Sequence, residues 1–99
     1  MSVKNKVVIV TGASRGIGKV IAQSFSKEGA NLVLVGRSKE AVEKVEVELK
    51  EENPNVISII ADVTNEEQVK HMAEKTIEVF GKIDVLVNNA GTAGPTTSV

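Results

Sequence analysis

The chain has 99 residues, of which 41% are apolar and 25% are charged, and its formal net charge is −1. This length allows at most one domain, and the composition is that of an ordinary globular protein rather than a disordered or membrane-embedded one. The small net charge gives no general attraction to nucleic acid, and no apolar run approaches the roughly 20 residues that cross a bilayer. The chain contains no cysteine, which excludes a disulfide framework and a thiolate metal site. We therefore expect a cytoplasmic protein with no nucleic-acid or membrane partner.

The first predicted element is a strand over residues 6–11, rich in β-branched residues, which ends in a glycine-containing loop. Three glycines follow in the spacing G-x-x-x-G-x-G, and a helical pattern begins at once. Gly12 allows a tight bend, Gly16 removes a side chain where the backbone must approach phosphates, and Gly18 lets the helix pack closely on the strand. The unpaired N–H groups of the first helical turn favour an anion. Glycines near a turn also occur without a ligand, so this interpretation depends on the rest of the chain.

Strand-like runs alternate with helical patterns along the whole chain. The runs recur at near-regular intervals, at 6–11, 31–36, 56–61 and 83–88. The first two are apolar without alternation, so both faces of their sheet must be covered. Right-handed crossovers then predict an α/β fold, a doubly wound parallel sheet of Rossmann type with strand order 3-2-1-4, incomplete on its C-terminal side. We expect residues 1–99 to form the N-terminal dinucleotide-binding part of a single Rossmann-like domain, with its ligand crevice beyond the carboxyl ends of the strands.

The predicted helices have recognisable ends. Gly29 and Gly81 end the first and third, Ser38 caps the second, and residues 64–67 form a capping box for the third. Their predicted buried faces are Ile17, Val20, Ile21 and Phe25; Val42, Val45 and Leu49; and Val69, Met72, Ala73, Ile77 and Phe80.

Two cations lie where a ribose would bind. After the second strand, dinucleotide-binding folds place an acidic side chain that accepts hydrogen bonds from the adenosine ribose. Here the position is occupied by Arg37, whose guanidinium suits a 2′-phosphate, and Arg15 in the glycine loop could reach the same phosphate. This pair favours NADP(H) over NAD(H). The alternative is that Arg37 and Lys39 are solvated charges, although cations at a helix start oppose the helix dipole.

Polar residues also follow the third and fourth strands. Asp62 can accept a hydrogen bond from an adenine amino group while Val63 covers the ring; alternatively, Asp62 serves only the start of the next helix. After the fourth strand, the side-chain amides of Asn88 and Asn89 can tie neighbouring strands together, and the small Ala90 and Gly91 leave room for a flat ring and a ribose.

These motifs together resemble the classical short-chain dehydrogenase/reductase family, and in particular the cofactor-binding half of NADP-dependent 3-oxoacyl-carrier-protein reductases. The resemblance covers essentially the whole chain. It implies an NADP(H) cofactor, hydride transfer to or from a small carbonyl or alcohol substrate, and a homo-oligomeric parent enzyme. The residues that it assigns to the cofactor are Gly12, Ser14, Arg15, Gly16, Ile17, Gly18, Arg37, Asp62, Val63, Asn88, Ala90 and Gly91.

The chain departs from the family in its catalytic residues. Members use a downstream serine and a Tyr-x-x-x-Lys motif, but this chain has no tyrosine, and Ser98 lies too early to be the family serine. We therefore expect no catalytic residue and no metal ligand here, with His71 exposed and Asp84 a solvated residue at a strand entry. Two hypotheses remain: the cofactor-binding portion of an NADP-dependent oxidoreductase, or a stand-alone non-catalytic dinucleotide-binding module, natural or engineered.

Overall fold

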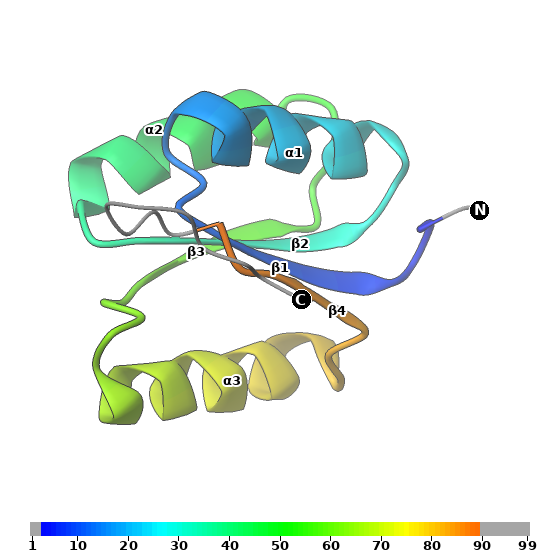
Figure 1. Cartoon of the computed structure of the whole chain (residues 1–99). Coiled ribbons are helices and arrows are strands. Elements are labelled where there is room, and N and C mark those ends of the chain that lie inside the picture. Colours follow the sequence, from blue (N-terminus) through cyan, green and yellow to red (C-terminus); the bar gives the residue numbers. More distant parts are fainter. Residues whose placement is uncertain (1–2, 90–99) are drawn as a thin grey trace.

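The computed structural model describes residues 3–89, in which strands and helices alternate from the first element to the last (Figure 1). The elements are β1 (Val7–Thr11), α1 (Gly16–Lys27), β2 (Asn31–Gly36), α2 (Lys39–Lys50), β3 (Val56–Ile60), α3 (Glu66–Phe80) and β4 (Val85–Val87). No helix among the described residues is both long and apolar enough to span a bilayer.

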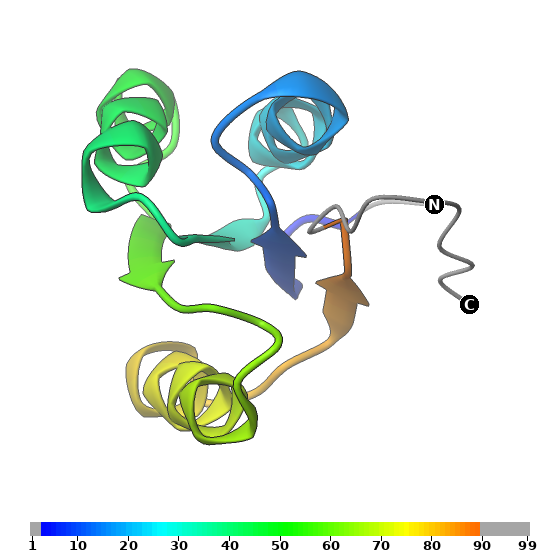
Figure 2. The same ribbon diagram turned by 60° about the vertical axis from the view of Figure 1, so that its left-hand side comes forward.

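The strands form one parallel sheet in the order β3-β2-β1-β4, which confirms the predicted order. Val8 marks the register at the centre, because it pairs with Leu32 of β2 on one side and with Val85 of β4 on the other. Helices α1 and α2 cover one face of the sheet and α3 covers the other, with β4 at one edge (Figures 1 and 2). The carboxyl ends of parallel strands all point the same way, so the loops that follow them meet at one edge of the sheet.

The central strands are buried on both faces, as their unbroken apolar sequence predicts. Successive side chains of a strand point to opposite faces. Val8, Val10 and Leu32 therefore join the core under α1 and α2, whereas Ile9 and Val33 join the core beside α3. All five side chains are at most 1% exposed, so the centre of the sheet is a rigid base for the loops at its carboxyl edge.

The buried face of α1 differs from the predicted one. Ile17 and Val20 are 71% and 59% exposed, and the buried positions of α1 are Gly18, Ala22 and Ser26. Small residues face the sheet because the helix lies close to it. The apolar positions at the edge of this face, such as Ile21 and Phe25, pack against the core only in part.

Helix α3 shows the same kind of difference. Thr76 is fully buried, and its hydroxyl donates to the carbonyl oxygen of Met72 at 2.8 Å, so the buried oxygen has a partner inside the helix. Ile77, predicted to be buried, is 51% exposed. The predicted face of α2 is confirmed, with Val42 and Val45 buried and Leu49 packed against them.

The cap of α3 lies one residue beyond the predicted one. Ser38 caps α2 as predicted, since its hydroxyl accepts a hydrogen bond from the Ala41 N–H at 3.3 Å. At α3 the predicted box begins at Thr64, but that hydroxyl donates to Asp62 Oδ1 instead. Asn65 therefore takes the cap position and accepts from the backbone N–H of Gln68 at 3.1 Å. Gly81 ends α3 in the left-handed conformation, with φ of 85°.

Asp84 is more than a solvated strand-entry residue. Its Oδ2 accepts a hydrogen bond from the Val7 N–H at 2.8 Å and pairs with Lys82 Nζ at 3.1 Å. Its backbone N–H donates to the Val7 carbonyl at 2.9 Å. The Val7 N–H and the Lys82 ammonium hold the pKa of Asp84 below its ordinary value of 3.8. Asp84 thus fixes the beginning of β1 against the residues that lead into β4.

We expect Asp84→Asn to lower the free energy of unfolding near neutral pH, with a smaller effect in acid. A carboxyl group whose pKa is lower in the folded state stabilises the fold above its unfolded-state pKa of 3.8, and this stabilisation is lost as the pH falls through the folded-state value. Urea unfolding of both proteins near pH 7 and at about pH 3 checks this. A difference that stays constant between the two pH values would contradict it.

We expect the chain to self-associate through β4. Among the described residues, β4 pairs only with β1, and Leu86 of β4 is 55% exposed. An open apolar edge is a template for pairing with another chain. Val85 packs against the core, so Leu86→Lys is the informative change, and Val47→Lys on the exposed side of α2 is the matched control. Light scattering at several concentrations should show larger particles for the wild type and the control than for Leu86→Lys. A wild type that stays monomeric would rule out this association.

Candidate functional site

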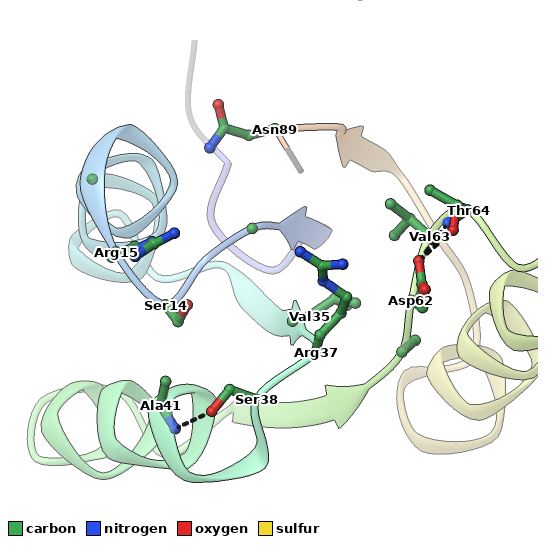
Figure 3. Close-up of a pocket in the computed structure, with 14 residues that line it drawn as sticks. Ser14, Arg15, Val35, Arg37, Ser38, Ala41, Asp62, Val63, Thr64 and Asn89 are labelled. Atoms are coloured by element: carbon green, nitrogen blue, oxygen red, sulfur yellow. Dashed lines mark hydrogen bonds between the residues drawn. The ribbon is translucent and has the colours of Figure 1, made fainter. Parts of the chain in front are cut away.

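A cavity of about 1010 Å³ opens at the carboxyl edge of the sheet, where the loops after the strands meet (Figure 3). Four segments form its wall: the loop after β1, the end of β2 with the start of α2, the turn after β3, and the residues after β4. The lining residues are Gly12, Ser14, Arg15, Gly16, Val35, Gly36, Arg37, Ser38, Ala41, Ala61, Asp62, Val63, Thr64 and Asn89.

The loop after β1 brings an uncapped helix start to this cavity. Gly12 and Gly16 both have φ of +62°, a conformation that glycine adopts without strain. A Cβ atom on Gly16 would meet no protein atom within 4 Å, so the backbone is open there. Arg15, the residue before α1, makes no side-chain cap, and the first turn of α1 has no acidic residue. Helices α2 and α3 each have a side-chain cap and an acidic residue in the first turn. Helix α1 has neither, so the positive end of its dipole is available to an anion.

Gly18 has a packing role rather than a place in the cavity wall. A Cβ atom there would lie 2.0 Å from the Gly12 carbonyl oxygen and 2.7 Å from Asn89 Nδ2. The start of α1 therefore lies directly against the loop after β1, the contact predicted for this glycine. Ile17, also assigned to the cofactor by resemblance, is 71% exposed and does not line the cavity.

Two arginines enter the cavity from different segments. Figure 3 shows Arg15, from the loop after β1, and Arg37, from the end of β2, on the same opening. Both are exposed, so their charge is available to a ligand. Lys39, the other cation considered at this helix start, is not part of the wall.

The turn after β3 contributes one carboxylate. Asp62 Oδ1 accepts hydrogen bonds from the Thr64 hydroxyl at 2.6 Å and from the Thr64 N–H at 2.9 Å. These two bonds, helped by the Arg37 charge, hold the pKa of Asp62 below its ordinary value. The group is therefore ionised at neutral pH. Asp62 therefore shapes the turn before α3 and also lines the cavity, whereas its contact with adenine stays a prediction. Val63 lines the cavity beside it.

The residues after β4 divide between structure and cavity. The Thr11 hydroxyl donates to Asn88 Oδ1 at 3.1 Å and accepts from the Asn89 N–H at 2.9 Å. Of the two amide side chains expected to tie the strands together, that of Asn88 ties β4 to β1, and its neighbour Asn89 lines the cavity. Ala90 and Gly91 lie outside the described residues.

Sequence reasoning missed several wall residues, including Ser38, Ala41, Thr64 and Asn89. Ser38, Thr64 and Asn89 each adjoin a residue that was predicted, and this proximity was the available signal. Ala41 lies inside α2, away from any predicted site residue, and had no such signal. Within residues 3–89, no three acidic or histidine side chains gather as a metal site, and His71 lies exposed on α3.

The model of the short chain dehydrogenase family matches residues 6–99. The chain belongs to this family.

Solved structures of short-chain dehydrogenases share the fold described above, and curated relatives match the chain in sequence. An uncharacterized oxidoreductase of Listeria monocytogenes is 44% identical over 91 residues, which are 92% of this chain and 37% of the relative. The 3-ketoacyl-(acyl-carrier-protein) reductase of Brucella melitensis, complexed with NADH, is 35% identical with a TM-score of 0.80, over 86% of this chain and 34% of that one. The RhlG/NADP active-site complex of Pseudomonas aeruginosa is 35% identical with a TM-score of 0.84, over 92% of this chain and 36% of that one.

The chain therefore spans less than two fifths of these relatives. Short-chain dehydrogenases use nicotinamide dinucleotide cofactors, and the two solved structures contain one with and one without the 2′-phosphate. Membership of the family thus leaves the choice between NAD(H) and NADP(H) to the residues of this cavity.

Proposed function

We propose that this chain is the cofactor-binding portion of an oxidoreductase that transfers hydride between NADPH and a small carbonyl or alcohol substrate. The choice of NADP(H) over NAD(H) rests on two exposed arginines, Arg15 and Arg37, that line the same cavity. A guanidinium pairs with a phosphate through two parallel hydrogen bonds. The position after β2 that holds a ribose-binding acid in NAD-dependent folds is here Arg37.

The remaining assignments follow the segments of the wall. The uncapped start of α1, with Ser14 and Gly16, would hold the pyrophosphate. Asp62 would accept from the adenine amino group, and Val63 would cover the ring.

The nicotinamide end of the proposed site rests on the family resemblance alone. By that resemblance, Asn88, Ala90 and Gly91 would line the nicotinamide and its ribose, whereas Ile17 belongs with the residues assigned to the pyrophosphate. When bound, the cofactor supplies the hydride. No residue of this chain is assigned the proton transfer, because the chain has no tyrosine. We also propose a cytoplasmic, homo-oligomeric protein, on the cysteine-free composition and the resemblance respectively.

Competition between matched nucleotides tests the proposal. Adenosine 2′,5′-bisphosphate and AMP differ only in the 2′-phosphate, so their ability to displace NADPH isolates the contribution of that group. NADPH fluorescence is a clean signal because the chain has no tryptophan. We expect the bisphosphate to compete at least about tenfold better than AMP, the effect of one charge-assisted pair. Equal competition, with NADH binding as tightly as NADPH, would contradict the choice of NADP(H).

A further inference from the structure

The turn after β3 is fastened to α3 by Gln68, a residue outside the cavity wall. Its side-chain Oε1 accepts a hydrogen bond from the backbone N–H of Asp62 at 2.7 Å. Its own backbone N–H donates to Oδ1 of Asn65, the cap of α3, at 3.1 Å. Gln68 is thus held at the start of the helix and reaches back to the residue at which the turn begins.

This contact completes the fixation of Asp62. The backbone N–H of Asp62 is held by Gln68, its backbone carbonyl accepts from the Asn65 N–H at 2.9 Å, and its Oδ1 accepts twice from Thr64. The backbone and one carboxylate oxygen are therefore set by the protein, and Oδ2 is the carboxylate oxygen that we assign to a ligand. Asp62 lines the cavity, whereas Gln68 does not.

We propose that Gln68 is a positioning residue for recognition of the adenine base, acting through the backbone of Asp62. This inference rests on the proposed function. The residue type fits the role, because glutamine offers an acceptor without a charge. Glutamate is an equally good residue three positions after a helix cap, but it would place a second carboxylate beside Asp62, near an anionic cofactor. The two positions before it, Glu66 and Glu67, carry the acidic charge of the first turn instead.

The test compares NADPH with its analogue in which hypoxanthine replaces adenine, so that the amino group becomes a carbonyl. We expect the wild type to prefer NADPH roughly tenfold, the range of one hydrogen bond to a charged group. Gln68→Met keeps the length of the side chain but removes the acceptor, and it should narrow the preference to about threefold, since a neutral exposed hydrogen bond contributes at the low end of its range. Gln68→Glu retains an acceptor and should retain most of the preference. Val79→Met, an exposed site near the other end of α3, is the control and should match the wild type.

The ratio of the two affinities separates positioning from a general loss of stability, because a partly unfolded protein loses affinity for both nucleotides equally. A Gln68→Met variant that keeps the wild-type preference would overturn the inference. So would a wild type that binds both nucleotides equally well, and in that case NADP(H) binding itself would still stand. A wild type that binds neither nucleotide would overturn the proposed function and this inference with it.

Discussion

Replacing Arg37 with aspartate is expected to weaken NADPH binding by about 1.5–3 kcal/mol, the contribution of a charge-assisted bidentate pair. The same change should leave NADH binding equal or improve it, because a carboxylate at the end of β2 can accept hydrogen bonds from the ribose hydroxyls. The preference for NADPH should therefore narrow or reverse. Fluorescence titration of both cofactors against the wild type and the variant measures the effect.

The control for this prediction is Lys39→Asp. It makes the same change of charge two residues further along the chain, but Lys39 does not line the cavity. Since interactions between exposed charges are strongly screened by salt, we expect Lys39→Asp to change the NADPH affinity much less. If both variants lose the same NADPH affinity, the loss comes from the change in net charge, and the assignment of Arg37 to the 2′-phosphate is wrong.

Gly18→Ala is expected to cost about 3 kcal/mol of unfolding free energy, the upper part of the range for overpacked sites. The added Cβ would lie 2.0 Å from the carbonyl oxygen of Gly12, a backbone atom that cannot move aside alone. For a small domain this is a large part of the total stability. Thermal or urea unfolding, followed by circular dichroism, provides the measurement.

Gly16→Ala separates this steric effect from the cost of backbone conformation. Gly16 has φ of +62° but no protein atom within 4 Å of an added Cβ, so the substitution should cost only about 1–2 kcal/mol of backbone strain. A Gly18→Ala protein that is as stable as Gly16→Ala would show that the start of α1 does not lie as close to Gly12 as described.

The sheet and its loops could be predicted because their signals are local. Unbroken apolar runs such as those of β1 and β2 identify buried parallel strands. Gly12 and Gly18 identify the turn between a strand and a close-packed helix. Handedness then leaves few possible strand orders. The cavity follows from this topology, because it forms where the predicted strand ends meet.

The errors arise where a contact depends on a partner distant in sequence. The apolar spacing of α1 suggested that Ile17 and Val20 face the sheet, but a helix that packs this closely uses Ala22 and Ser26 instead. Asp84 has an ordinary sequence environment, and its bond to the Val7 N–H exists only once β1 and β4 lie side by side.

Similar reasoning explains the two asparagines after β4. Sequence alone does not show which of the two side chains binds to β1. In the structure the hydroxyl of Thr11 donates to the side chain of Asn88 and accepts from the backbone N–H of Asn89.

Nuclear magnetic resonance can map NADPH binding most directly, by following each backbone amide of the isotope-labelled chain during a titration. We expect saturable shifts at residues 12–16, at Arg37 and at residues 62–64, the three segments of the cavity that we assign to the pyrophosphate, the 2′-phosphate and the adenine. The amides at the C-terminal end of α2 should stay unchanged. Shifts confined to other surfaces, or none at saturating NADPH in a folded chain, would contradict the claim that this cavity binds the cofactor.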